Sequence, residues 1–268
     1  MIRYQRMYSK PILAGLVTVA VSAFPQGIGG RARDLPPSAV AKAGPAPRLP
    51  DGKPDLGNGK GVWNPRTITN LSGSGPQGPG RSPTEKLIEV PMQPWAKALY
   101  EARIATAYKE DPEGRCLPPG IPRMYATPFP FQIFQLPDRV LFIFEGATHI
   151  WREVFTDGRP HSPDPNPTFL GEAIGHWDGD TLVVDTIGFN EESWLDQDGH
   201  PHTDALHTTE RFTRTNEYTL RYEVTIDDPH AYTRPWTNSY LIPFVPGTEL
   251  MEYICQENNK DAHHLVGK

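Results

Sequence analysis

Short runs of alternating apolar and polar residues fill the chain from Phe131 onward. A period of two is typical of strands that bury one face, and turn residues between the runs favour hairpins. The strongest such signal is the Asp178-Gly179 dipeptide. The pattern predicts about nine strands, nearly all linked as hairpins. The predicted strands cover residues 131–136, 139–145, 149–155, 171–177, 181–189, 207–215, 218–226, 234–242 and 247–256.

A series of hairpins removes its exposed edges by closing on itself. We therefore expect a mainly β fold, an antiparallel meander that closes into a lipocalin-like, calycin-type barrel; a two-sheet β-sandwich is the alternative. Helical spacing of apolar residues predicts one helix at Trp95–Glu110. Residues 24–90 are rich in Pro and Gly and predict an arm, in which Gly61–Pro65 can form a short docking strand. The helix and the barrel then make one domain at 91–268.

Residues 1–23 have the features of a signal peptide. Basic residues precede an apolar run at Pro11–Phe24, which is too short to span a membrane. We therefore expect a periplasmic or secreted protein without a membrane span in its mature part. The net charge of -6 and the lack of a basic stripe argue against nucleic acid as a partner. In an exported protein the two cysteines, Cys116 and Cys255, favour a disulfide, with two buried free thiols as the alternative.

A two-residue turn at Asp178-Gly179 predicts that Glu172 and Asp185 lie directly opposite each other, with His176 on the same face. Like charges across a ladder repel, so one carboxyl must hold a proton or a cation must lie between them, unless solvent screens them at the rim of the sheet. A carboxyl that holds a proton can act as a general acid, and its partner as a base.

A two-residue turn at Asn216-Glu217 predicts that His207, Arg211 and Tyr222 share the apolar inner face of the next hairpin, while Glu210 points away. His207 can then act as a base, Arg211 can hold a carboxylate or an enolate-like oxygen, and Tyr222 can donate a proton. A structural network around a paired Arg211 is the alternative. The candidate catalytic residues are His207, Arg211, Tyr222, Asp185 and His176.

Three further residues are candidates for substrate binding: Glu172, Arg152 and Trp151. Arg152 lies among aliphatic residues, as an interior cation or as half of a buried ion pair. His200, His202 and Asp204 lie close together in the sequence, and two imidazoles with a carboxylate suit zinc or iron. A divalent metal there is one possibility; a loop with both histidines at the rim is the other. The spacing does not follow the cupin pattern, and we expect no cofactor.

Three stretches, "DPEGRCLPPGIPRM", "HIWREVFTDGRPH" and "GHWDGDTLVVDTIGFN", resemble a family of exported bacterial β-rich proteins without a known function. The resemblance covers most of residues 45–268 and implies a signal peptide, a Pro/Gly-rich arm and a β-rich body. It implies no reaction. Our leading hypothesis is an enzyme that performs acid–base chemistry of the lyase, isomerase or hydrolase type on a small, partly apolar molecule inside the barrel. A carrier of a hydrophobic small molecule and a structural or interaction protein of the envelope are the alternatives.

Overall fold

The computed structural model describes residues 42–74 and 84–257, so the predicted signal peptide lies outside the described residues. This part of the chain contains nine strands, two α-helices and two short 3-10 helices. The strands are β1 (Gly61–Trp63), β2 (Phe131–Gln135), β3 (Arg139–Phe144), β4 (Trp151–Phe155), β5 (Glu172–Asp178), β6 (Thr181–Ile187), β7 (His207–Asn216), β8 (Thr219–Asp227) and β9 (Trp236–Pro246). The helices are α2 (Pro94–Ala105), α3 (Gly146–His149), η1 (Pro112–Arg115) and η2 (Arg123–Tyr125).

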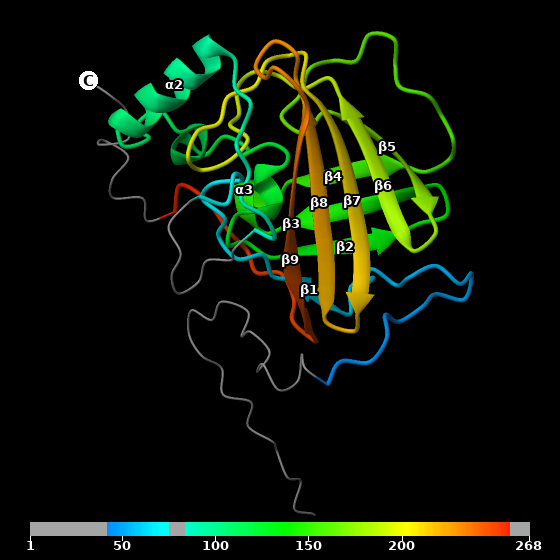
Figure 1. Cartoon of the computed structure of the whole chain (residues 1–268). Helices are drawn as coiled ribbons and strands as arrows, with labels where there is room; N and C mark the ends of the chain where they lie inside the picture. Colours follow the sequence, from blue (N-terminus) through cyan, green and yellow to red (C-terminus); the bar gives the residue numbers. More distant parts are fainter. Residues whose placement is uncertain (1–41, 75–83, 258–268) are drawn as a thin grey trace, which may run out of the picture. The chain divides into compact units, whose positions relative to one another are not determined.

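The nine strands form one sheet that closes into a ring (Figure 1). The Pro/Gly-rich arm supplies the closing strand, because β1 pairs with both β9 and β2. This confirms the mainly β prediction and the docking strand expected at Gly61–Pro65. In Figure 1, β6 to β9 cross in front of β2 to β4, so two halves of the ring face each other across the interior.

Two details of the predicted meander are wrong. Strands β4 and β5 are parallel, with Val154 paired to Ala173, so the connection at 156–171 is a crossover and not a hairpin. Residues 247–256 do not form a strand; β9 instead continues to Pro246, and the chain after it is irregular. The crossover matters for function because it places a long loop against the outside of the ring.

The hairpin of β5 and β6 turns at Gly179-Asp180, one residue later than predicted. Gly179 has a φ of +58°. The first central position of a type II′ turn requires a positive φ, which glycine adopts readily. The later turn shifts the pairing by two residues, which leaves every side chain on its predicted face. Glu172 and Asp185 therefore share a face, but the prediction that they lie directly opposite each other is wrong.

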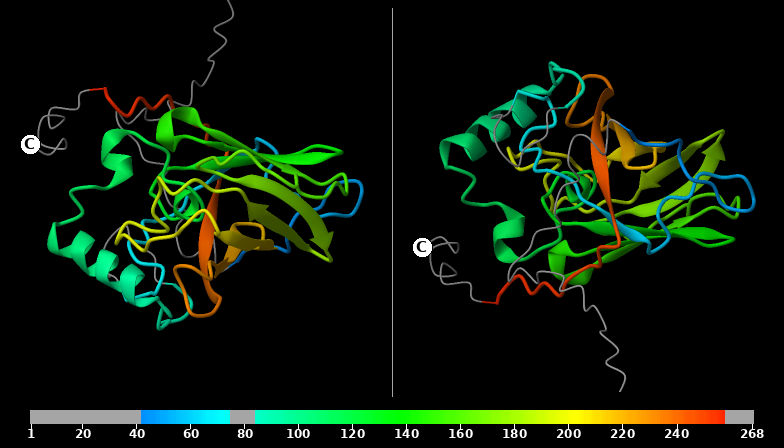
Figure 2. Two further views of the ribbon diagram at one scale, coloured as in Figure 1. Left: turned by 90° about the horizontal axis from the view of Figure 1, so that it is seen from above. Right: turned by 90° about the horizontal axis from the view of Figure 1, so that it is seen from below.

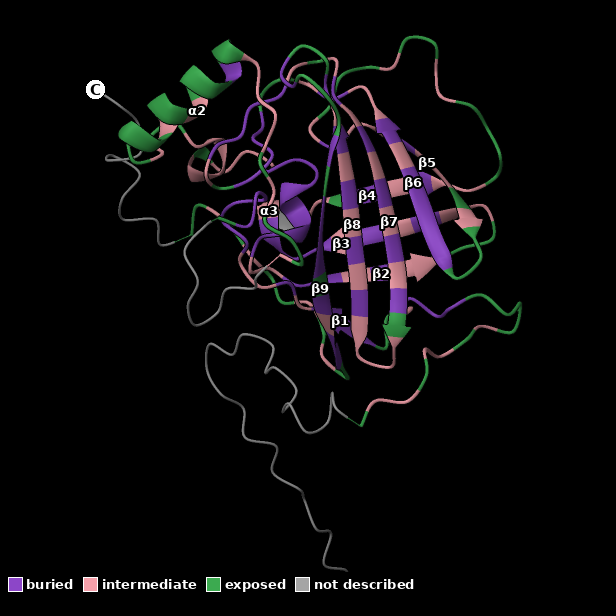
Figure 3. Ribbon diagram, viewed as in Figure 1, coloured by how far each residue is buried: buried purple, intermediate pink, exposed green. Residues whose placement is uncertain are grey.

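A β-bulge at Thr215 shifts the register between β7 and β8 by one residue. A shift of one residue turns a strand's side chains to the other face. The predicted shared face of His207, Arg211 and Tyr222 is therefore wrong: the two β7 residues point outward and Tyr222 points inward. Alternating burial along β7 and β8 shows these two faces in Figure 3.

Tyr125, from η2, fills the interior of the ring. Its ring centroid lies 4.9 to 5.7 Å from aromatic rings on β2, β3, β7 and β8. These neighbours are Phe131, Phe142, Phe144, Phe212 and Tyr222. All of them are buried, so the ring is filled at this level by packed side chains.

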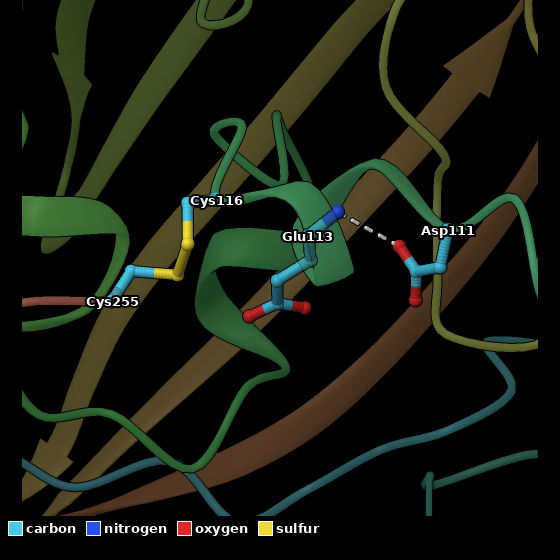
Figure 4. Close-up of a disulfide and its surroundings, with 4 residues drawn as sticks. All are labelled: Asp111, Glu113, Cys116 and Cys255. Atoms are coloured by element: carbon cyan, nitrogen blue, oxygen red, sulfur yellow. Dashed lines mark hydrogen bonds between the residues drawn. A yellow bond between two sulfur atoms is a disulfide. The ribbon is translucent and has the colours of Figure 1, made fainter. Parts of the chain in front are cut away.

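One end of the ring carries α2 and the loops around it (Figures 1 and 2). The helix begins at Pro94, one residue before the predicted start, and ends at Ala105, because Ala107 and Tyr108 adopt positive φ angles. The disulfide predicted between Cys116 and Cys255 is present and joins residues 139 positions apart (Figure 4). No helix in the described part of the chain is long and apolar enough to cross a membrane.

Candidate active site

Four titratable side chains form a hydrogen-bonded chain on the outer face of β5, β6 and β7. Glu172 Oε1 lies 3.1 Å from His161 Nδ1, and His161 Nε2 lies 2.9 Å from Asp185 Oδ1. The other oxygen of Asp185 lies 2.7 Å from Nε2 of His207. The His207 side chain is 40% exposed, so the chain of contacts ends at solvent. Of the predicted catalytic group, the structure thus brings Asp185 and His207 together.

His161 reaches this face because the β4–β5 crossover folds back over the sheet. The chain turns after β4 at Asp157-Gly158, where Gly158 has a φ of +82°. Arg159 pairs with Asp157 and its guanidinium lies 3.8 Å from the centre of the Phe155 ring. The backbone N–H of Ser162, the residue after His161, donates to Glu172 Oε1 at 2.7 Å. These contacts hold the imidazole of His161 between the two carboxylates.

The charges in this chain are coupled. The hydrogen bond to Asp185 raises the pKa of His207. The same bond is the main reason why the pKa of Asp185 is lowered; the bond to His161 adds to this effect, while burial opposes it. A neutral imidazole has only one N–H. Because His161 faces a carboxylate with each ring nitrogen, it links Glu172 to Asp185 in one line of hydrogen-bonding groups.

A pocket of about 500 Å³ opens beside Glu172, outside the ring. Its walls come from β4, from the start of β5 and from the end of the crossover loop. They include the side chains of Trp151, Glu153, Phe155, Phe169 and Glu172. Trp151, a predicted substrate-binding residue, is 65% exposed. The pocket thus joins exposed apolar surface to the first member of the hydrogen-bonded chain.

A second polar cluster lies inside the ring and is closed to solvent. Arg152 makes a bidentate pair with Glu210, through Nη1–Oε1 and Nη2–Oε2 distances of 3.0 and 2.5 Å. The hydroxyl of Tyr222 donates to Glu210 at 2.9 Å, while Arg152 donates to the hydroxyls of Tyr125 and Thr186. Burial alone lowers the pKa of Arg152, but the Glu210 carboxylate raises it overall. Arg152 is therefore half of a buried ion pair, the alternative that the sequence left open.

The remaining predicted catalytic residues lie apart from the outer chain. Tyr222 is buried inside the ring, where burial raises its pKa well above the ordinary value. Arg211 points outward and pairs with Asp178 at 2.9 Å. His176 is an exposed residue on the outer face of β5. The five residues do not converge on one point, because Tyr222 lies inside the ring and Arg211 pairs with Asp178.

His200, His202 and Asp204 do not form one cluster. His200 Nδ1 lies 2.6 Å from the buried carboxylate of Asp196, and its ring stacks on Tyr100. Asp204 is exposed. The expected loop is present, but the expected rim positions are wrong, since both histidines are buried. Among the described residues, no three His, Cys, Asp or Glu side chains are grouped as ligands for a metal ion.

His202 instead faces a serine. Its Nε2 lies 3.0 Å from Ser193 Oγ, and its Nδ1 lies 3.1 Å from the backbone oxygen of Thr203. Burial lowers the pKa of His202 and favours the neutral imidazole. This is the geometry of a nucleophile and a base. Both side chains are buried, however, so the pair is a contact that fixes the loop and is closed to a substrate.

Sequence reasoning missed two residues, His161 and Glu210. His161 lies in a proline-rich loop, where no periodicity indicates which way a side chain points. Glu210 could have been found from Phe212, the one large apolar residue of β7: if Phe212 points inward, so does Glu210, two residues before it. The hairpin register, which depended on the turn, gave the opposite answer.

No family model, curated protein or solved structure matches the chain. The geometry alone defines its class: a closed β-sheet protein whose interior is packed around Tyr125 and whose outer face carries a carboxylate–histidine chain beside a pocket.

Proposed function

We propose that the protein is an enzyme that performs general acid–base chemistry on a small, partly apolar molecule bound in the outer pocket. The observation that carries this proposal is the chain Glu172–His161–Asp185–His207, which begins in the wall of the pocket and ends at an exposed imidazole. Such a chain supplies a proton acceptor to a bound molecule and connects that acceptor to solvent. The sequence suggested the ring interior for this chemistry, but Tyr125 occupies it at the level of Arg152.

Glu172 is the group that meets the substrate. Its Oε1 is held by Ser162 and His161, whereas its Oε2 has no hydrogen-bond partner in the described part of the chain. In the proposed step, Oε2 takes a proton from a carbon atom of the substrate, and the electron pair stays on the substrate or expels a leaving group. The proton then returns to another atom of the substrate or to the leaving group. Isomerisation and elimination both balance in this way without a further reactant.

Proton exchange tests the proposal across a panel of compounds, so the natural substrate need not be identified first. Small ketones, esters and amines with acidic C–H groups are incubated with the protein in D2O, and deuterium incorporation is followed by NMR. We expect exchange in at least one compound, and a loss of about 100-fold or more in the Glu172→Gln variant. Glu223→Gln, which removes an outer-face carboxylate of β8 that pairs with Arg221, is the matched control. If the wild-type protein exchanges no compound faster than the Glu172→Gln variant does, the proposal is wrong.

We also propose that the ring is a closed β-barrel and that the protein is exported. The ring of strand pairs and the β1–β9 contact support the first proposal. Cysteines introduced at Val62 and Val245, which are paired across this contact, should form a disulfide in the folded protein. The predicted signal peptide and the Cys116–Cys255 bond support export. Recovery of the full-length protein only from the cytoplasmic fraction would contradict it.

A further inference from the structure

The outer pocket presents aromatic and acidic side chains. Glu153 and Glu172 supply the carboxylates, and Trp151, Phe155 and Phe169 supply the rings. Arg152 also borders the pocket, but its guanidinium is buried inside the ring and bound to Glu210. Within the part of the chain that the structure describes, the ionisable side chains that the pocket offers to a ligand are therefore carboxylates.

Glu153 and Glu172 lie on neighbouring strands. Val154 and Ala173 pair in parallel and point inward, so the residues before them, Glu153 and Glu172, are neighbours on the outer face. Neighbouring strands are about 4.8 Å apart, a spacing at which like charges repel. Arg139 donates to Oε1 of Glu153 at 3.1 Å, and Oε2 of Glu153, like that of Glu172, has no hydrogen-bond partner among the described residues. Each of the two residues thus keeps one carboxylate oxygen that can accept from a positively charged ligand.

Trp151 is the most exposed aromatic residue of the pocket. The Phe155 ring already has the guanidinium groups of Arg159 and Arg139 at 3.8 and 5.0 Å from its centre. Trp151 is 65% exposed and is next to Arg152 at the start of β4. Indole is the aromatic side chain that attracts cations most strongly, and it also covers the apolar body of a ligand.

We propose that the pocket selects small organic cations, namely amines with a ring-shaped or similarly compact apolar body, and that Glu153 determines this specificity. The inference rests on the proposed function, because it takes the outer pocket as the substrate site. The ammonium group donates to Oε2 of Glu153, and the body of the ligand lies on Trp151. A C–H group on the carbon next to the nitrogen-bearing carbon then faces Oε2 of Glu172, the proposed proton acceptor, so the electron pair of the broken C–H bond can expel the amine.

Three isosteric probes test the charge preference by titration calorimetry: benzylamine, which is a cation at pH 7, neutral benzyl alcohol and anionic benzoate. We expect benzylamine to bind more tightly than the other two, and added salt to weaken its binding. Glu153→Gln should weaken benzylamine by about tenfold, the loss expected for a hydrogen bond to a charged group, and leave benzyl alcohol unchanged. Trp151→Ala should weaken both, and Glu223→Gln should change neither.

Three results overturn the inference: no saturable binding of benzylamine, equal or tighter binding of benzoate, or an unchanged preference in Glu153→Gln. These titrations measure binding without turnover, so they test the charge preference of the pocket separately from the proposed function. Selective benzylamine binding without deuterium exchange in any compound leaves the pocket's specificity standing and removes the acid–base proposal. Exchange in neutral ketones that depends on Glu172, without benzylamine binding, supports the acid–base proposal and removes the preference of the pocket for cations.

Discussion

Replacing either member of the buried pair Arg152–Glu210 removes one charge and leaves the other inside the ring. The side chains of Arg152 and Glu210 are 1% and 0% exposed, so the remaining charge has no access to water. Breaking such a pair costs about 3 to 5 kcal/mol of the free energy of unfolding. We therefore expect Arg152→Met and Glu210→Gln each to destabilise the protein by about 4 kcal/mol, a large share of the roughly 5–15 kcal/mol typical of a domain.

The double variant is the decisive measurement. In Arg152→Met/Glu210→Gln no charge remains, and the glutamine can still accept from Tyr222, so its cost should be smaller than the sum of the two single costs by at least about 2 kcal/mol. Guanidinium denaturation followed by circular dichroism gives the three free energies. The pair Arg211–Asp178, on the exposed face of the same sheet, is the control and should matter far less. Single variants that cost under about 1 kcal/mol, or costs that add, would refute the reasoning.

Three further measurements test other parts of the structure. Asp185→Asn should lower the pKa of His207 toward the ordinary value of 6.5, as measured by NMR titration, and an unchanged pKa would contradict the contact. Because the pKa of His207 is raised in the folded protein, the contact stabilises the fold at low pH, and this stabilisation is lost as the pH rises through the folded pKa. Removing the disulfide by Cys116→Ser should lower the free energy of unfolding by up to about 4 to 5 kcal/mol in the chain-entropy model, and a reductant should give the same loss in the wild type but none in the variant. Tyr125→Ala should cost about 3 to 5 kcal/mol, because it empties the space between the two halves of the ring, and a loss below about 1 kcal/mol would mean that this space refills.

The strands could be predicted from the sequence because alternation is a local signal. In β8, the apolar positions Leu220, Val224 and Ile226 give the inner face directly, and Tyr222 lies on the same face. The faces of β7 could not be obtained from the turn, because one unpaired residue at Thr215 reverses them and a bulge has no signature in a polar strand. A prediction that used Phe212 as the anchor would have had the right face.

Only part of the candidate site could be predicted from the sequence, for a different reason. Asp185 and His207 lie on predicted strands, so their positions follow from period and register. His161 comes from a crossover loop, which the antiparallel meander predicted from the sequence does not contain. Its position depends on tertiary contacts with Phe155 and Glu172 through neighbouring loop residues, and no local pattern encodes these.

Strand β7 carries both polar clusters, and its alternation keeps them separate. Glu210 points into the ring and is fully buried, while His207, three residues earlier, points out and is 40% exposed. Changes on the inner face should therefore alter stability, because a buried charge loses its partner. Changes on the outer face should alter proton exchange and ligand binding while the fold persists, because solvent replaces lost contacts there. A variant of His207 that unfolds the protein, or one of Glu210 that changes only the exchange rate, would mean that the two faces do not divide these roles.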